Sequence, residues 1–172
     1  MNILLGVTGS VASTLQEKLT QELYKKECEV RTVLTESAKN FPLKRTADRY
    51  DDASEWYHYS TLNTVLHIDL IKWADIFLIA PCSANSLAKI ANGICDNLLT
   101  CCARAWNFEK PFFIAPAMNT RMWDHPVTKE HLDKIEKWGI IVVPPVEKVL
   151  FCGDTGVGAL APIKTILETC LN

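Results

Sequence analysis

Glycine and polar residues follow three separate apolar runs of the chain, where they could bind a phosphorylated cofactor. The three loops are Gly6–Val11, Thr35–Ser37 and Ala80–Ser86. Glycine lets the backbone approach an anion, and hydroxyl or amide groups at a helix start suit a phosphate or a heteroaromatic edge. Each loop alone also fits ordinary helix capping, because Ser, Thr and Asn are common N-cap residues. The three together favour one phosphorylated, planar cofactor across the edge of a sheet.

The first loop matches neither of the two best-known phosphate-binding motifs. Gly6–Val11 lacks the Gly-x-Gly-x-x-Gly spacing of dinucleotide-binding proteins, and no Gly-Lys-Ser/Thr follows it. A tight turn with a serine cap therefore remains an alternative for this loop alone.

A fourth loop, Ala115–Trp123, has the most unusual composition. Core packing accounts for its two methionines and its tryptophan. It does not account for Asn119, because a buried amide needs hydrogen-bond partners. We therefore expect this loop to contribute to a binding site.

The histidines and cysteines taken alone indicate little chemistry. His67 lies between Leu66 and Ile68, which is typical of a structural histidine. Seven cysteines are present without a Cys-x-x-Cys pair, so the sequence predicts no metal site and mostly reduced, buried thiols.

Apolar runs alternate with segments of helical spacing along the chain. Strands are predicted at residues 3–8, 29–34, 76–80, 111–115 and 140–143, and helices at 13–26, 67–73, 83–91, 98–106 and 127–138. This alternation predicts an α/β fold with a mainly parallel sheet and helices on both faces. Ligands in such folds bind at the carboxyl ends of the strands, where all four loops begin.

Composition excludes several classes of protein. With 172 residues, 48% hydrophobic residues and a net charge of −2, the chain fits one globular domain rather than a disordered or nucleic-acid-binding segment. Its longest uncharged stretch, residues 76–88, is too short and too polar to span a bilayer. No basic segment precedes the first apolar run, so we expect a cytoplasmic protein.

Five segments of the chain, taken in order, resemble the motifs of the flavin-dependent cysteine decarboxylases, and within them the phosphopantothenoylcysteine decarboxylases. The matching segments are Val65–Leu70 with Trp73–Asp75, Pro81–Ser86, Ile94–Thr100, Pro116–Trp123 and Cys152–Ala159. Any one segment is modest support, whereas the ordered set is highly specific.

The resemblance implies a flavodoxin-like (Rossmann-type) three-layer sandwich over residues 1–172, with FMN as cofactor and a homotrimer that holds FMN near the subunit interface. It implies decarboxylation of 4′-phosphopantothenoylcysteine to 4′-phosphopantetheine in coenzyme A biosynthesis. The thiol side is oxidised transiently to a thioaldehyde, carbon dioxide leaves, and the enethiolate is reduced again.

The resemblance also assigns residue roles. His67 is the expected acid/base, Asn119 binds the substrate carboxylate, and Cys152 donates the proton in the final reduction. Lys72 stands where the family usually has arginine, which gives a point charge in place of a bidentate clamp. The residues expected to contact FMN are Gly9, Ser10, Val11, Thr35, Ser37, Ser83, Ala84, Asn85, Ser86 and Ala117, and those expected to contact substrate are Asn119, Lys72, Met122, Phe151 and Gly153.

Two other functions are compatible with the same motifs. A halotolerance-type regulatory subunit would inhibit a protein phosphatase, but such regulators tend to carry long extra arms and an acidic tail. A peptidyl-cysteine decarboxylase would omit the final reduction, which the presence of Cys152 disfavours. The glycines after Cys152 predict a mobile segment that could close over the substrate.

Overall fold

Six parallel strands form the central sheet of the computed structural model, which describes residues 1–43, 48–149, 153 and 155–171. The strand order is β3-β2-β1-β4-β5-β6, with bounds β1 Asn2–Val7, β2 Glu29–Leu34, β3 Arg49–Tyr50, β4 Ile76–Cys82, β5 Phe112–Pro116 and β6 Ile141–Val142. The predicted α/β class with a parallel sheet is confirmed, and the five predicted strands all occur. The short edge strand β3 was not predicted.

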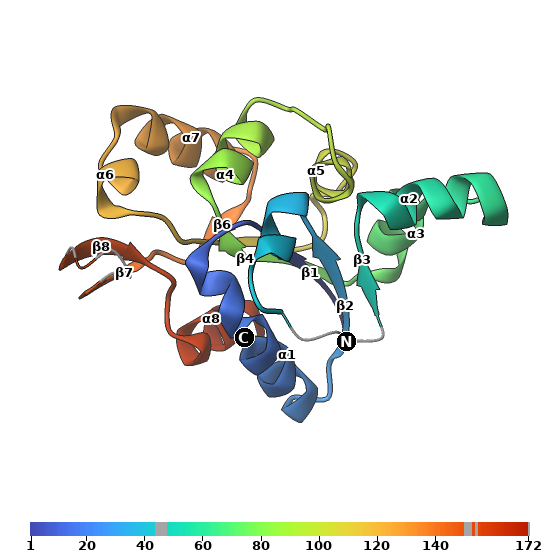
Figure 1. The fold of residues 1–172 in the computed structure, drawn as a ribbon, viewed down its shortest axis with the longest axis horizontal. Coiled ribbons are helices and arrows are strands. Elements are labelled where there is room, and N and C mark those ends of the chain that lie inside the picture. Colours follow the sequence, from blue (N-terminus) through green and yellow to red (C-terminus); the bar gives the residue numbers. More distant parts are fainter. Residues whose placement is uncertain (44–47, 150–152, 154, 172) are drawn as a thin grey trace.

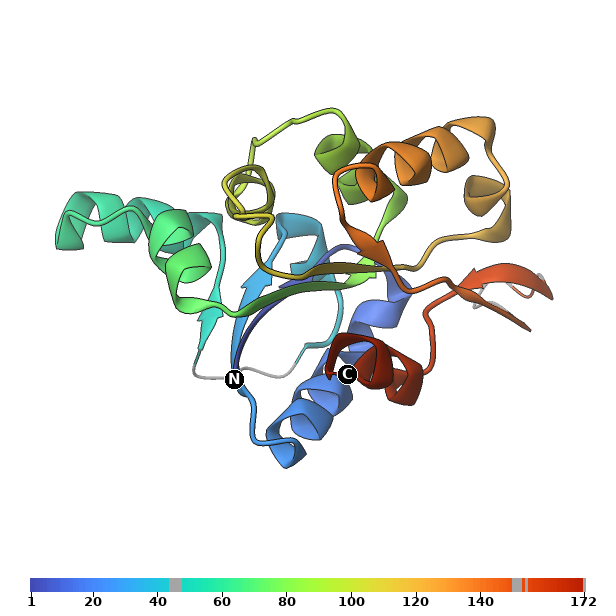
Figure 2. The ribbon, with the colours of Figure 1, turned by 180° about the vertical axis from the view of Figure 1, so that it is seen from behind.

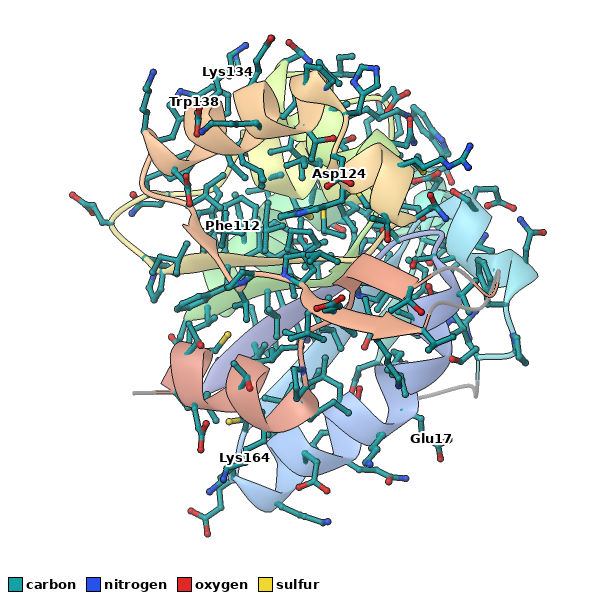
Figure 3. The ribbon with its side chains drawn as sticks, turned by 90° about the vertical axis from the view of Figure 1, so that its left-hand side faces the viewer. Glu17, Phe112, Asp124, Lys134, Trp138 and Lys164 are labelled. Atoms are coloured by element: carbon teal, nitrogen blue, oxygen red, sulfur yellow. The ribbon has the colours of Figure 1, made fainter. Side chains whose placement is uncertain are left out.

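Helices cover both faces of this sheet (Figures 1 and 2). One face packs against α3 (Leu66–Trp73), α4 (Ala84–Ala91), α5 (Leu98–Arg104) and α7 (Pro126–Glu136), and the other against α1 (Gln16–Lys25) and α8 (Ile163–Leu171). In Figure 3, Lys134 and Trp138 mark the first layer, Glu17 and Lys164 mark the second, and Phe112 lies between them in the sheet.

The alternating side chains of each strand explain the two hydrophobic cores. In β1, Leu4 faces the layer of α3, α4, α5 and α7, whereas Ile3 and Leu5 face α1 and α8. All three side chains are fully buried. A strand buried on both faces needs a continuous apolar run, which is the pattern by which the strand was predicted.

Several short elements were not predicted from the sequence. These are α2 (Asp52–Tyr57), α6 (Thr120–Trp123), α8, the two turns of 3₁₀ helix η1 (Val11–Leu15) and η2 (Glu36–Asn40), and the π-helical turn η3 (His58–Leu62). Most are too short to show an apolar periodicity. Among the described residues, no helix is long and apolar enough to cross a membrane.

A two-stranded antiparallel ribbon, β7 (Val146–Val149) and β8 (Thr155–Ala159), lies apart from the central sheet. Figure 3 shows it crossing the side of the molecule between α6 and α8. The segment after Cys152 forms a paired strand from Thr155 onward, and its predicted mobility stays a prediction.

Candidate active site

The carboxyl ends of β2, β1, β4 and β5 lie side by side in the sheet, which brings all four predicted loops together. We call the residues that follow these strands, Thr8–Ser10, Thr35–Ser37, Ser83–Ser86 and Ala117–Asn119, the strand-end cluster. The parallel pairing of β1 with both β2 and β4 sets this arrangement, because parallel strands end at the same edge.

Thr8 joins the first loop to the third. Its buried hydroxyl donates to the Pro81 carbonyl over 2.9 Å and accepts from the Ser83 backbone N–H over 2.7 Å. The Ser13 hydroxyl donates to the Thr8 carbonyl over 2.6 Å, which fixes the start of the following helical turn. These contacts make the first and third loops one hydrogen-bonded unit.

Ser10 joins the first loop to the fourth. Its hydroxyl donates to the Ala117 carbonyl over 3.3 Å, and it caps η1 by accepting from the Ala12 N–H. The Ala117 N–H in turn donates to the Cys82 carbonyl over 2.9 Å. The capping alternative for Ser10 is therefore correct, and the same side chain also links two loops.

The second loop closes against the first through Gly9 and Ser37. A Cβ added to Gly9 would lie 2.5 Å from the Ser37 Cβ, so only glycine allows this approach. Thr35 lies beside them with a buried hydroxyl that has no hydrogen-bond partner among the described residues. A buried hydroxyl without a partner is costly, which points to a ligand at this position.

The third loop forms the start of α4. Ser83 is the N-cap, and its hydroxyl accepts from the Ser86 N–H over 3.3 Å. Ser86 is buried, whereas Asn85 is exposed. Burial raises the pKa of the neighbouring Cys82 thiol to about 12, so this cysteine stays protonated and unreactive.

The fourth loop meets the β7–β8 ribbon. The Met118 N–H donates to the Gly158 carbonyl over 2.9 Å. Asn119 is the N-cap of α6, and its side-chain oxygen accepts from the Arg121 N–H over 2.9 Å. The next hydroxyl, of Thr120, is buried and lacks a hydrogen-bond partner among the described residues.

His67 lies on α3 and contacts Glu55 of α2, outside the strand-end cluster. Its Nδ1 lies 2.7 Å from Glu55 Oε1, and its backbone N–H donates to Glu55 Oε2 over 3.1 Å. Both side chains are partly buried, with exposed fractions of 25% for His67 and 20% for Glu55. Glu55 was not predicted from the sequence, because twelve residues separate it from His67 and no local periodicity connects them.

The predicted substrate residues are not all brought to one place. Met122 is half exposed on α6, next to the strand-end cluster. Lys72 is exposed on the last turn of α3, and five helical residues place it about 140° around the axis from His67. Gly153 is exposed with φ 89°, whereas Phe151 and Cys152 lie outside the described residues.

His67 and Asn119 lie on opposite sides of the chain. In Figure 1, α3 and α2 are at the right of the molecule, whereas α6 and the β7–β8 ribbon are at the left, and Figure 2 shows the same separation from behind. One chain therefore does not bring the His67 segment beside the fourth loop.

An apolar cavity on the other side of α4 is unrelated to these residues. It has a volume of about 410 Å³ and is lined by residues of α4, α5 and the segment around Trp138. None of its lining residues belongs to the strand-end cluster or to the pair of His67 and Glu55.

A parallel α/β sheet with polar loops at adjacent strand ends, the first of which contains Gly9, is typical of proteins that bind a phosphorylated cofactor. The family model described as Flavoprotein matches residues 1–172, so the chain belongs to the flavoprotein family. The chain is 48% identical to "Phosphopantothenoylcysteine decarboxylase HAL3a" of Glycine max, over 97% of this chain and 81% of that protein. It is 47% identical to "Phosphopantothenoylcysteine decarboxylase" of Mus musculus, over 96% and 83%.

Solved structures agree with this relationship. A mutant PPC decarboxylase complexed with pantothenoylaminoethenethiol superposes with a TM-score of 0.92 at 44% identity, covering 98% of this chain and 94% of that one. "The FMN binding protein AtHal3" superposes with a TM-score of 0.88 at 45% identity, covering 98% and 93%. The family and the fold expected from the motifs are confirmed, whereas the roles of individual residues stay predictions.

Proposed function

We propose that this chain is an FMN-dependent phosphopantothenoylcysteine decarboxylase, a carboxy-lyase of coenzyme A biosynthesis. It converts 4′-phosphopantothenoylcysteine to 4′-phosphopantetheine and carbon dioxide. The observation that carries the proposal is the strand-end cluster, whose buried Thr35 hydroxyl has no partner among the described residues, in a chain 48% identical to a decarboxylase of this name.

The strand-end cluster fits FMN. A phosphate needs donors, and the cluster offers hydroxyls and backbone N–H groups at the starts of η1, η2 and α4. The Thr35 hydroxyl is free to donate to a ligand, and Gly9 keeps the first two loops close. The residues that hold FMN are Gly9, Ser10, Val11, Thr35, Ser37, Ser83, Ala84, Asn85, Ser86 and Ala117. Bound by these residues, FMN would supply a reversible hydride acceptor for the carbon that carries the sulfur.

The protein's own side chains bind the substrate and move protons. Asn119 binds the carboxylate, since an amide donates a hydrogen bond without adding a charge that would strongly stabilise the ground state. His67 takes the thiol proton as the substrate is oxidised. Cys152 donates the proton that the enethiolate carbon needs in the final reduction. Met122, Phe151, Gly153 and Lys72 complete the substrate contacts.

The active form is a homotrimer with FMN near the interface between subunits. Two features support a site shared between chains. His67 and Asn119 lie on opposite sides of one chain (Figure 1), and the elements beside His67 expose large apolar side chains. These side chains, which we call the α2–η3 patch, are Trp56, Tyr57, Tyr59, Leu62 and Val65.

Mass spectrometry of 4′-phosphopantothenoylcysteine after incubation with the FMN-loaded protein tests the function. Loss of carbon dioxide alone is the expected result. Unchanged substrate, with FMN bound, would contradict the proposal and favour a regulatory role. A product that has lost carbon dioxide and two hydrogens would indicate a peptidyl-cysteine decarboxylase type of reaction, without the final reduction.

A further inference from the structure

The carboxylate of Glu55 contacts His67 at two points. Oε1 lies 2.7 Å from the ring nitrogen Nδ1, and Oε2 accepts the backbone N–H over 3.1 Å. We propose that Glu55 is a positioning residue, which keeps the proton of His67 on Nδ1 and leaves Nε2 to exchange a proton with the substrate. The inference deepens the proposed function and rests on it.

The chemistry of the two groups sets the direction of the ring hydrogen bond. An ionised carboxylate has no hydrogen to donate, so Nδ1 must carry the proton that the two atoms share. In a neutral imidazole, Nε2 then has the free lone pair that a base requires. The second contact, to the backbone, fixes the carboxylate itself, so that the ring is held in one orientation.

Glu55 can act in this way because α2 is anchored at its first turn. The Asp51 carboxylate caps α2 by accepting from the Ser54 N–H over 2.9 Å and forms an ion pair with Lys39 over 2.7 Å. Asp52 accepts the Leu98 N–H of α5 over 2.7 Å. The helix that carries Glu55 is thus tied both to η2, beside the strand-end cluster, and to α5.

The cysteines of α5 near this pair do not compete for the proton. Burial raises the pKa of the Cys102 thiol, and the nearby Glu55 carboxylate raises it further. Burial also raises the pKa of Cys101, to about 11. Both thiols therefore stay protonated near neutral pH, and the Cys102 thiol lies 3.9 Å from the His67 carbonyl as a weak donor.

Two substitutions separate the charge of Glu55 from its size. Glu55→Gln keeps the shape but offers an amide that can donate to Nδ1 and so favour the proton on Nε2. Glu55→Asp keeps the carboxylate with a shorter reach. We expect Glu55→Gln to lower kcat by at least about 10-fold with KM for substrate nearly unchanged, and Glu55→Asp to retain more activity. The matched control is Glu22→Gln, which removes a carboxylate paired with Lys25 on α1.

The position of the proton on the His67 ring can be measured without any catalytic turnover. Proton–nitrogen correlation spectra of protein with ¹⁵N-labelled histidine show which ring nitrogen carries the proton, and His67→Asn assigns the signal. The proton is expected on Nδ1 in the wild type and in Glu22→Gln, and on Nε2 in Glu55→Gln. A wild-type signal with the proton on Nε2 overturns the inference, even if no Glu55 variant folds.

Activity distinguishes this inference from the proposed function. If the wild type decarboxylates and Glu55→Gln does so at the same rate, Glu55 does not position His67. If the wild type fails to decarboxylate while the proton is on Nδ1, the proposed function fails and the pairing of Glu55 with His67 stands.

Discussion

Two threonines at the strand ends show how hydrogen-bond partners separate a structural hydroxyl from one that can bind a ligand. The Thr8 hydroxyl donates to Pro81 and accepts from Ser83, so protein groups use it fully. The Thr35 hydroxyl is equally buried but has no partner among the described residues. Substitution by valine should therefore weaken ligand binding at Thr35 and lower the stability of the protein at Thr8.

Thr35→Val should weaken FMN binding without destabilising the protein. Valine has nearly the shape of threonine and removes a hydroxyl that contributes no described hydrogen bond within the chain. We expect the dissociation constant of FMN, measured by quenching of flavin fluorescence, to rise about 10-fold. Thr169→Val is the control, since the Thr169 hydroxyl only donates to its own helix. Unchanged FMN affinity in Thr35→Val would remove this residue from the cofactor site.

Thr8→Val should destabilise the protein itself. It leaves the Ser83 N–H without its 2.7 Å acceptor in a buried region. Such a loss costs about 1–3 kcal/mol, so we expect the free energy of unfolding of the cofactor-free protein in urea to fall by this amount. A variant as stable as the wild type would mean that Thr8 does not hold the first and third loops together.

At the scale of elements, α2 depends on the pair of Asp51 and Lys39. Burial alone would raise the pKa of Asp51, but hydrogen bonds from Lys39 and Ser54 outweigh it and hold the pKa below its usual value. Because the folded-state pKa is lowered, this carboxylate contributes stability above its unfolded-state value near 3.8, and the contribution is lost as the pH falls through the folded-state pKa.

Asp51→Asn should therefore flatten the dependence of stability on acid. Asparagine still caps a helix but cannot pair with Lys39 as an ion. We expect urea unfolding to show the wild type more stable near neutral pH, by less than about 1 kcal/mol because the pair is partly exposed. The difference should shrink as the pH falls below 3.8 and vanish once Asp51 is protonated in the folded state. A difference that stays constant across this pH range would assign the effect to packing.

The contact between the fourth loop and β8 depends on Gly158. Its φ of 146° is unfavourable for other residues, and a Cβ there would overlap the Met118 carbonyl oxygen. Gly158→Ala should displace the ribbon from the Asn119 loop and raise KM for the substrate. Gly139→Ala is the control, because Gly139 has φ 92° but open space around its Cβ position.

The two glycine variants separate the effect of an unfavourable φ, which both share, from the effect of a steric clash, which only Gly158→Ala has. Both should lower the free energy of unfolding by about 1 kcal/mol or more, since both impose an unfavourable φ. Only Gly158→Ala should change KM. If both variants had the wild-type KM, the packing of the ribbon on the fourth loop would have no part in substrate binding.

The sequence predicts long elements better than short ones, for physical reasons. The buried strands are apolar on both faces, so their runs are visible without any alignment, and their order along the chain implies the parallel sheet. The helix α2 has six residues and no buried side chain, so it leaves no periodic pattern. Glu55 was missed for the same reason, because only the folded chain brings α2 beside α3.

At the scale of the whole molecule, the position of the α2–η3 patch favours an active site that forms between two chains. Trp56 is 69% exposed and Tyr59 is 64% exposed, which is unusual for such large side chains. The patch adjoins α3, which carries His67, and lies far from α6 (Figure 1). Packing of this patch on the α6 side of a second copy would bring His67 of one chain toward Asn119 of another.

Mixing two inactive variants tests this arrangement directly. His67→Asn and Asn119→Ala should each lack activity while still binding FMN. If each site takes His67 from one chain and Asn119 from the next, co-expression in equal amounts should restore about a quarter of the wild-type activity, because one site in four then has both residues. The control is a co-expressed mixture of His67→Asn with the double variant, in which no site can be complete.

A variant with a more polar α2–η3 patch tests the same arrangement through the size and the activity of the assembly. Trp56→Ser with Tyr59→Ser removes side chains that are 69% and 64% exposed, so the fold of each chain should survive. We expect this variant to sediment as a smaller species and to lose decarboxylation, because His67 and Asn119 then stay on separate chains. Full activity in the smaller species, or no activity in the co-expressed mixture, would place the whole site within one chain.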